Sequence, residues 1–370
     1  MRFRNRTLEI DLVLPSFAAR DAIGYHTLKL QELIRSLGIG SEIYADEIKG
    51  ELRGLARPVS MLMHQGHHPS RYIVYQASTG SPVVRSLVNR KEPLLINFHN
   101  ITPKDTLGRW DIGVGMVVGA GLKQLSVLKE RISGAISVSE YNRWCLKQEG
   151  ITKNSLVASP FIPISPNHPA MGSKSSPLQQ GKSGSRWLFV GRVAPNKAQH
   201  DIVRAFSAYL KGWDSSATLT LVGSVSSQSY SASLKELINE LGVDDTVHVT
   251  GPLDDAELEE EYCRATVFVC LSDHEGFGFP VIEALSHSLP VIAFASTALP
   301  ETLGDAGILL SSKEPLRVAA AVALVENDPT LREQLHTNAR DTLARYSPEA
   351  AKRENLGALE ALIPQIADYR

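Results

Sequence analysis

The chain has 370 residues, which exceeds what one hydrophobic core usually supports, so we expect two domains. Its 38 basic and 40 acidic residues give a formal charge of −2, which argues against a nucleic-acid footprint spread over the whole surface. The three cysteines, Cys145, Cys263 and Cys270, form no CxxC pair and leave one odd. They argue against a disulfide framework and against a cysteine zinc site, and a reducing cytosol fits them best.

The amino-terminal stretch begins with basic residues, but its apolar part is short and is interrupted by Glu9 and Asp11. It therefore predicts a first strand rather than a signal peptide. The uncharged run at 112–122 is too short to span a bilayer. It could lie against a membrane, but we favour its burial because lysine and arginine are sparse within it. We expect a cytoplasmic protein, with contact at the inner face of the membrane left open.

Short runs rich in β-branched residues alternate with helical patterns, which predicts an α/β protein with parallel sheets covered by helices. In the first half, we expect helices at 25–37 and 119–132. The expected strands of this half are 8–15, 41–45, 72–76, 94–99, 134–139 and 155–160.

From about Ser165 to Ser185 the composition changes to Ser, Gly, Pro, Lys and Gln, which is typical of a linker or loop. The "GKS" within it is not a phosphate-binding loop, because that motif requires glycine where Ser176 stands. A second series of strands then follows, at 186–191, 218–223, 246–251, 266–272, 289–294 and 307–310. The expected helices between them are 198–211, 231–241, 255–264, 279–288 and 314–326.

These patterns predict two doubly wound, Rossmann-like domains, at 1–165 and 186–345, joined by a linker at 166–185. The last segment, 346–370, follows a helical pattern and could pack against either domain, including back on the first.

The stretch "EGFGFPVIEAL" at 275–285 follows a predicted strand and leads into a helix. Pro280 suits the first helical position because its missing N–H costs nothing there. The glycines permit close approach of the backbone, and the helix start can bind an anion such as a diphosphate. Glu283 would repel an adjacent phosphate and is better placed to accept sugar hydroxyls, while Glu275 can reach another part of the ligand. Alternatively, Glu283 only caps its helix and Glu275 is solvated.

A second loop, in "FVGRVAPNKAQHDIVRAF" at 189–206, also follows a predicted strand. Arg192 and Lys197 lie in it, where both could neutralise the charge on a departing diphosphate. A lone Arg and Lys on a loop are usually solvent-exposed. Together with the acidic loop, however, they predict a phosphate site.

These two segments resemble the donor domain of retaining glycosyltransferase family 4, which has the GT-B fold of two Rossmann-like domains facing a cleft. The resemblance covers 186–345 and extends to "INFHNITP" at 96–103 and "DAIGYHTLKLQELIRSLG" at 21–38, which look like acceptor-side segments of a bacterial surface-polysaccharide branch. It implies transfer of a hexose-type sugar from a nucleotide-diphosphate donor, UDP- or GDP-linked, to a saccharide or lipid-linked glycan, in polysaccharide or O-antigen biosynthesis.

The resemblance assigns site residues position by position. Arg192 and Lys197 match the pair that binds the donor diphosphate, Glu275 the acid beside the transferred sugar, and Glu283 the ribose-binding acid. His99 matches a histidine that lines the catalytic centre, and Gly24 would let the amino-terminal loop approach the phosphates. The segment 249–253 would border the base. The remaining donor-binding positions are Gly276, Phe277, Gly278, Phe279, Pro280 and Val281.

The chain departs from the family at two places, which bear on the geometry of the loops more than on the chemistry. Ala198 stands where the family usually has glycine, and the commoner Gly-Gly of the first loop is represented only by "RDAIG".

The resemblance also implies retention at the anomeric carbon, through an oxocarbenium-like pair in which the departing phosphate helps to deprotonate the acceptor. No base is assignable. The chain contains no Asp-x-Asp, so we expect no metal and no other cofactor. The histidines of "HQGHH" at 64–68 lack an evident acidic or cysteine partner.

Other functions are less favoured. A glycosidase would place its two carboxylates on opposite faces of a sugar, whereas Glu275 and Glu283 should touch different parts of one ligand. A dehydrogenase needs Gly-x-Gly-x-x-Gly, and "GVGMVVGAG" at 113–121 has the wrong spacing. A GT-B epimerase or phosphorylase, or a non-catalytic sugar-nucleotide-binding subunit, stays open as the alternative.

Overall fold

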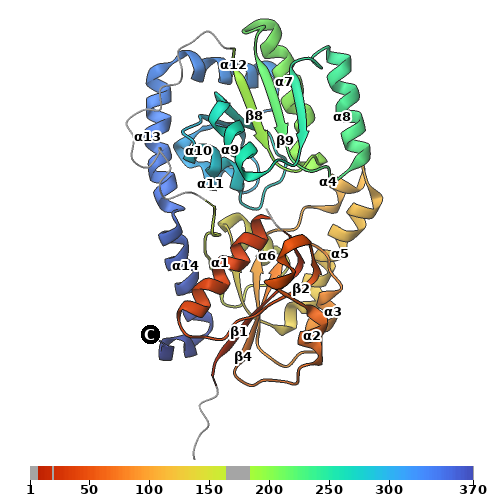
Figure 1. Ribbon diagram of the computed structural model, residues 1–370, viewed down its shortest axis with the longest axis vertical. Coiled ribbons are helices and arrows are strands. Elements are labelled where there is room, and N and C mark those ends of the chain that lie inside the picture. The colour runs from red at the N-terminus through yellow and green to blue at the C-terminus, as the bar shows by residue number, and fades with distance from the viewer. Residues whose placement is uncertain (1–6, 19–20, 164–183, 370) are drawn as a thin grey trace, which may run out of the picture. The chain divides into compact units, whose positions relative to one another are not determined.

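The computed structural model describes residues 7–18, 21–163 and 184–369, and the chain divides into two compact units (Figure 1). Unit 1 comprises Met1–Lys104, Gly113–Pro163 and Tyr346–Arg370, and unit 2 comprises Asp105–Ile112 and Ile164–Arg345. Most of the expected linker, at 166–183, lies outside the described residues.

Unit 1 contains a parallel sheet of seven strands in the order β3-β2-β1-β4-β5-β6-β7. The chain moves outward from β1 to β3 and then returns to β4 on the other side of β1, so the order reverses between β1 and β4. The strands are β1 Glu9–Phe17, β2 Ile43–Ile48, β3 Arg57–Pro58, β4 Arg71–Ala77, β5 Leu94–Phe98, β6 Ile132–Ser137 and β7 Ser155–Val157.

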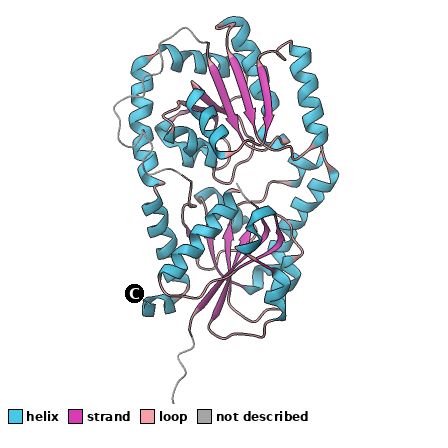
Figure 2. Ribbon diagram, in the orientation of Figure 1, coloured by secondary structure: helices cyan, strands magenta, loops and turns pink. Residues whose placement is uncertain are grey.

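Helices flank this sheet (Figure 2). The first of them begins at an Asp21 cap, whose side chain accepts a hydrogen bond from the Gly24 N–H. The α-helices are α1 Ala22–Ser36, α2 Val59–His64, α3 Val83–Val88, α5 Ile112–Leu128, α6 Glu140–Gln148 and α14 Pro348–Leu362, and the 3₁₀ turns are η1 Gly50–Gly54, η2 Lys129–Arg131 and η6 Pro364–Tyr369.

The carboxy-terminal segment is part of the core of unit 1. Leu359, Ile363 and Ile366 are fully buried in the same cluster as the strand residues Ile10, Leu12 and Leu14 and the α1 residue Ile34. Hydrogen bonds fasten it at both ends, because the Leu8 N–H donates to the Tyr369 hydroxyl and the Ser159 N–H donates to Glu354. The last 25 residues therefore complete the amino-terminal unit rather than the unit that precedes them in the chain.

Unit 2 contains a parallel sheet of six strands in the order β10-β9-β8-β11-β12-β13, which reverses between β8 and β11. Bulky aromatic side chains fill its core, with Trp187, Phe189, Phe206 and Phe268 all buried. The strands are β8 Arg186–Val190, β9 Thr218–Val222, β10 Val247–Gly251, β11 Val267–Cys270, β12 Val291–Phe294 and β13 Ile308–Leu310.

The helices of unit 2 include one that crosses from unit 1, because α4 begins at Lys104 and the rest of it belongs to unit 2. The segment Asp105–Ile112, expected in the first domain, joins unit 2 because the Trp110 ring packs on Tyr230 and the Trp110 carbonyl accepts from the Ser229 hydroxyl. The helices are α4 Lys104–Gly108, α7 Gln199–Gly212, α8 Gln228–Leu241, α9 Asp255–Arg264, α10 Phe279–Ser286, α11 Leu299–Leu303, α12 Pro315–Asn327 and α13 Pro329–Arg345, and the 3₁₀ turns are η4 Pro195–Lys197 and η5 Gly304–Ala306.

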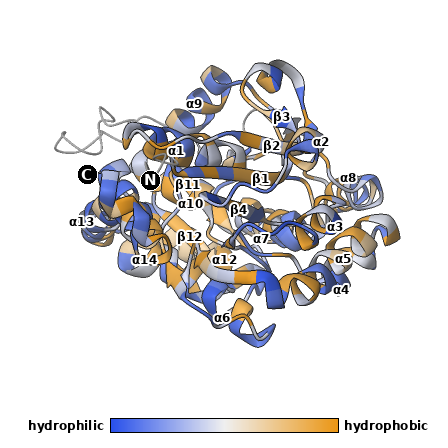
Figure 3. Ribbon diagram, turned by 90° about the horizontal axis from the view of Figure 1, so that it is seen from below, coloured by the Kyte–Doolittle hydropathy of each residue, from blue (hydrophilic) through white to orange (hydrophobic). Residues whose placement is uncertain are grey.

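The two doubly wound parallel sheets confirm the expected fold class. The expected burial of 112–122 is wrong for part of this stretch. Gly115, Val118 and Gly121 are buried, but Met116 is 71% exposed and Val117 is 49% exposed, and apolar residues recur along α5 (Figure 3). The helix also starts seven residues earlier than 119. Together with η2 it forms a stretch, Ile112–Arg131, that is long and apolar enough to cross a membrane by length and composition alone.

Candidate donor-binding site

The two loops singled out in the sequence follow neighbouring strands of unit 2. One leaves β8 and the other leaves β11, and these strands pair in parallel where the strand order reverses. In open α/β sheets, the crevice beyond the carboxyl ends of the strands at such a reversal is where ligands bind. The fold therefore brings 191–198 and 271–278 to one edge of the sheet.

The loop after β8 carries both predicted cations. Arg192 is exposed, whereas Lys197 is only partly exposed at the end of η4. The Gln199 side chain donates to the Arg192 carbonyl at 2.9 Å, which holds the loop against the start of α7. Ala198 has φ 51°, the left-handed region that favours glycine. This chain therefore forms the left-handed turn with an alanine, which is fully buried.

An ion pair joins the two loops, with Lys197 Nζ 2.6 Å from Glu275 Oε1. The two side chains are only 15% and 11% exposed, so the pair is shielded from bulk water. Asn196 connects the same loops through its main chain and its side chain. Its carbonyl accepts from the Asp273 N–H at 2.8 Å, and its Nδ2 donates to the His274 carbonyl at 3.3 Å. Asn196 was not predicted from the sequence, because its role depends on a contact across 78 residues.

Thr297 holds the backbone of Glu275, and His274 precedes this acid in the chain. The Glu275 N–H donates to the Thr297 hydroxyl at 2.9 Å, so the backbone of this acid is fixed from β12's side of the sheet. Burial lowers the pKa of the neighbouring His274 to about 4, against the opposing effect of Glu275. At neutral pH, His274 is therefore uncharged, and Lys197 is the cation that faces Glu275.

The glycine loop continues directly into α10, which begins at Phe279 as predicted, so that Pro280 is its second residue rather than its first. Gly276 and Phe279 are partly exposed, whereas Phe277 and Val281 are buried. Gly278 caps the helix with φ 97°, and a Cβ there would lie 2.8 Å from the Leu299 side chain, so no other residue fits without movement. The first N–H groups of an α-helix lack intrahelical acceptors, which makes this turn suited to an anion.

Glu283 lies one turn into α10 and is held by Tyr262 of α9. The Tyr262 hydroxyl donates to Glu283 Oε2 at 2.8 Å, and burial raises the pKa of this carboxyl above its ordinary value. Burial and the adjacent Glu283 also raise the pKa of Tyr262 well above its own. Tyr262 was not predicted as a site residue. It fixes the direction of the carboxyl group and takes one of its two oxygens.

In unit 1, the predicted His99 follows β5 and belongs to a buried polar group at the carboxyl edge of the sheet. His99 Nε2 lies 2.7 Å from Gln76 Oε1, and its ring meets His26 edge to face at 5.2 Å. Burial, and secondarily His26, lower the pKa of His99 well below its ordinary value. Burial likewise lowers the pKa of His26 to about 3. Both rings are therefore neutral, and neither His26 nor Gln76 was identified from the sequence.

Gly24 was expected to serve the amino-terminal loop, but it lies in the first turn of α1. Its N–H is already taken by the Asp21 carboxylate at 3.0 Å. A Cβ at this position would approach the Ala18 carbonyl to 3.0 Å, so the glycine allows the chain after β1 to pass close to the helix.

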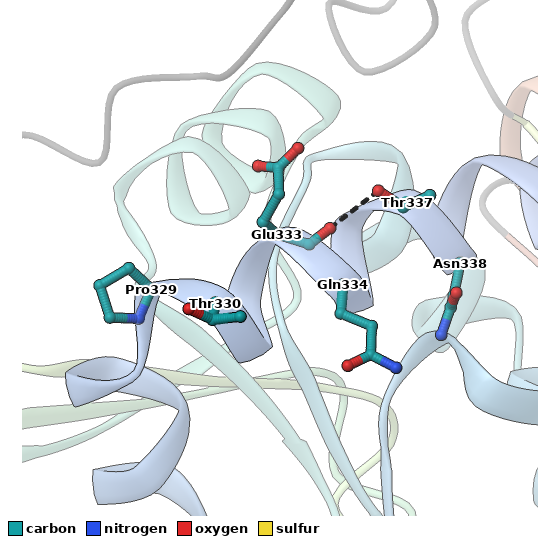
Figure 4. A pocket seen from close by; sticks show the side chains of 6 residues that line it. All are labelled: Pro329, Thr330, Glu333, Gln334, Thr337 and Asn338. Carbon is teal, nitrogen blue, oxygen red and sulfur yellow. Dashed lines mark hydrogen bonds between the residues drawn. The ribbon is translucent and has the colours of Figure 1, made fainter.

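One surface depression of unit 2 lies away from these loops, on the outer face of α13. Figure 4 shows its lining side chains, with the Thr337 hydroxyl donating to the Glu333 carbonyl at 2.9 Å. It is lined by Pro329, Thr330, Glu333, Gln334, Thr337 and Asn338. None of the predicted site residues borders it.

Comparison with known proteins supports the interpretation of unit 2. Residues 177–342 match the family "Glycosyl transferases group 1". A D-inositol 3-phosphate glycosyltransferase of Kineococcus radiotolerans is 29% identical over 201 residues, which is 50% of this chain and 46% of that protein. The O-antigen chain mannosyltransferase B of Escherichia coli is 25% identical over 216 residues, covering 57% and 54%. The chain thus spans about half the length of these curated relatives.

Solved structures share the fold over nearly the whole chain. Anabaena Alr3699/HepE in complex with UDP-glucose aligns with a TM-score of 0.73 at 17% identity, covering 96% of this chain and 100% of that one. WaaG, a glycosyltransferase involved in lipopolysaccharide biosynthesis, aligns with a TM-score of 0.70 at 12% identity, covering 96% and 99%. The chain therefore has the GT-B fold. Its second unit is the part that matches the group 1 glycosyl transferases.

Proposed function

We propose that this chain is a retaining glycosyltransferase of family 4 type, which transfers a hexose-type sugar from a UDP- or GDP-linked donor to a saccharide or lipid-linked glycan. The biosynthesis of a surface polysaccharide, such as an O-antigen, is the process proposed for it. Both curated relatives named above support the sugar-transfer activity, and the name of the O-antigen chain mannosyltransferase supports a glycan acceptor.

The observation that carries the proposal is the junction of two loops at the switch point of unit 2. Lys197 and Glu275 form a shielded ion pair there, and Asn196 fastens the same loops through the backbone. The cation is thereby positioned before any ligand arrives. A preorganised charge stabilises a developing anion without the cost of reorganising solvent, which is what departure of a diphosphate requires.

Each residue has a role in this reaction. Arg192 and Lys197 neutralise the diphosphate, and the backbone of the turn from Gly276 to Val281 holds the phosphate and the sugar hydroxyls. Glu283, held by Tyr262, accepts a hydroxyl of the ribose, and Glu275 contacts the transferred sugar. His99, neutral and bonded to Gln76, keeps the role in the catalytic centre that the family resemblance implies.

Retention and independence of metal are parts of the same proposal. The departing phosphate deprotonates the acceptor on the face that it leaves, so the sugar keeps its configuration. The charge that a divalent metal would supply comes from Arg192, Lys197 and the helix start. Added chelator should leave turnover unchanged, and a rate restored only by Mg²⁺ or Mn²⁺ would contradict this part.

The exposed apolar side chains of α5 support a lipid-linked acceptor. Met116 and Val117 are exposed, as is Val127 at 59%, and such a surface can lie at the boundary of a membrane. In a flotation assay, the wild type should rise with anionic vesicles, whereas the M116D/V117D variant should stay behind. Equal flotation of both would remove the membrane from the proposal.

The central experiment measures thermal unfolding against a panel of nucleotide sugars. A ligand at a hundred times its dissociation constant should stabilise the fold by about 2.7 kcal/mol. Product analysis of the protecting donor then separates the activities, because transfer or hydrolysis supports a glycosyltransferase and an altered sugar on the nucleotide supports an epimerase. A folded chain that no UDP or GDP conjugate protects would overturn the proposal.

Glu275→Gln tests the role of the acid itself. The neutral amide keeps the shape of the loop, so nucleotide protection should persist while turnover falls by roughly 10²–10³-fold. Glu333→Gln, at an exposed position on α13, serves as the matched control with unchanged turnover. Turnover of Glu275→Gln equal to that of the wild type would remove the catalytic assignment.

A further inference from the structure

Glu259, Cys263 and His287 form a cluster on unit 2 that the proposed reaction does not use. One ligand atom of each residue lies within 4.8 Å of the other two. Glu259 and Cys263 are exposed and stand four residues apart on one face of α9, while His287 ends the neighbouring helix α10 (Figure 1). Within the described residues, no other group of three such side chains comes this close together, and the histidines at 64–68 do not.

The separations suit a tetrahedral ion. Metal–ligand distances of about 2.0–2.3 Å place the ligand atoms of a tetrahedral zinc site roughly 3.3–3.8 Å apart. Here His287 Nε2 is 2.9 Å from Glu259 Oε2, and Cys263 Sγ is 3.9 Å from Glu259 Oε1. Glu259 and Cys263 are exposed, so their side chains have room to turn toward a common ion. Imidazole, thiolate and carboxylate together favour Zn²⁺ over Mg²⁺ or Ca²⁺.

The histidine is already oriented as a ligand. Its Nδ1 lies 2.7 Å from the Glu283 carbonyl, which accepts the Nδ1–H and leaves Nε2 directed toward Glu259. The ring stacks on Tyr262 at 4.6 Å, and the side chain is only 8% exposed. A backbone carbonyl bonded to the second ring nitrogen is the usual support of a metal-bound histidine. The cluster therefore has an outer layer of contacts as well as three ligand atoms.

We propose that Glu259, Cys263 and His287 bind one divalent transition-metal ion of the zinc class, with water at the fourth position. Binding of the ion displaces the hydrogen bond between His287 and Glu259 and releases the proton of the Cys263 thiol. It connects α9, which carries Tyr262, to α10, which carries Glu283. The ion belongs to this helix pair, and the diphosphate chemistry has no step through it.

Cobalt spectroscopy on the full chain tests the proposal. Co²⁺ added to metal-free protein under a phosphine reductant should give visible bands of a four-coordinate ion and a thiolate-to-cobalt charge-transfer band, saturating at one equivalent. Zn²⁺ should displace both. Zn²⁺ at a hundred times its dissociation constant should also raise the unfolding temperature by roughly 5–10 °C.

Matched variants assign the ligands. Cys263→Ser should abolish the charge-transfer band, whereas Cys145→Ser, in unit 1, should retain it. His287→Gln and Glu259→Gln should weaken binding at least tenfold, and Glu260→Gln, the exposed neighbour on α9, should not. A cooperative unfolding transition, measured without metal, shows that each variant is folded. Absence of a charge-transfer band in the wild type, or its persistence in Cys263→Ser, would overturn the proposal.

Discussion

The two units share one architecture, but the side chains at the carboxyl edge of the sheet are uncharged in unit 1 and charged in unit 2. In unit 1, the carboxyl edge of the sheet presents His26, His99 and Gln76, which are uncharged at neutral pH and bonded to one another or to the backbone. In unit 2, the equivalent edge presents Arg192, the pair Lys197–Glu275, and Glu283. Both sheets are parallel and both reverse their strand order beside the first strand. The loops, rather than the sheets, therefore decide which edge can bind a diphosphate.

Removal of the Lys197 cation is the most direct test of this difference between the two sheet edges. Lys197→Ala should lower turnover by roughly 10²–10³-fold and abolish protection by a nucleotide sugar, because the diphosphate loses its fixed counter-charge. It should also destabilise the fold by roughly 1–3 kcal/mol, since Glu275 is left shielded without its partner. His99→Gln, at the other edge, should preserve nucleotide protection. Protection retained in Lys197→Ala would show that the charge of this loop does not bind the donor.

The neutrality of unit 1 predicts a dependence of stability on pH. His26 has a pKa of about 3 in the folded chain and an ordinary value near 6.5 when unfolded, so between these values only the unfolded chain takes up the proton. The free energy of unfolding should therefore fall with decreasing pH below 6.5, by about 1.4 kcal/mol per pH unit for this group. Denaturant titrations at pH 7 and pH 5 measure it.

His26→Gln should reduce that pH dependence, and the exposed His64→Gln should keep it. An identical difference between pH 7 and pH 5 in wild type and His26→Gln would contradict the assignment of a buried neutral ring.

The fastening of the two loops in unit 2 is tested by Asn196→Ala. Loss of the Nδ2 donor leaves the buried His274 carbonyl without this hydrogen bond, at a cost of roughly 1–3 kcal/mol in the free energy of unfolding. The affinity for the donor should fall as well, since the loops are no longer held in register. Asn239→Ala, at an exposed position on α8, should leave both quantities unchanged. A normal donor affinity in Asn196→Ala would assign the residue to stability alone.

The smallest effect is expected at Ala198, where the family usually has glycine. Ala198→Gly relieves a left-handed alanine by about 1 kcal/mol and loses a similar amount through the flexibility of glycine, so stability should be nearly unchanged. Ala205→Gly, buried inside α7, should cost about 1 kcal/mol because no strain is relieved. Equal losses at the two positions, measured by denaturant titration, would contradict the strained backbone at Ala198.

The sequence predicted the fold class and most strands of both sheets, because buried parallel strands are continuous apolar runs between turn residues. It also located Lys197, Glu275 and Glu283, since each stands in or just after a loop that follows such a run. The assignment of their roles rests on family resemblance. The 17-residue helix α13 was not predicted, and its polar sequence has few buried positions to mark it.

The contacts that support the site could not be predicted in the same way. Asn196, Tyr262 and Gln76 act on side chains or carbonyls far away in the sequence, and no local pattern encodes such a partner. The cysteines form no CxxC pair, so the sequence predicted no cysteine zinc site. Cys263 and Glu259 meet a histidine 28 residues from that glutamate, and only the packing of α9 on α10 brings the three together.

The return of the chain to unit 1 at its end has a consequence for synthesis on the ribosome. Unit 2 has all its helices once Arg345 has emerged, whereas the β1 core stays open until α14 and Ile366 follow. Unit 1 is thus begun before unit 2 and completed after it. During that interval the apolar side chains of its strands are exposed. A nascent chain in that state is prone to aggregation and is a substrate for chaperones.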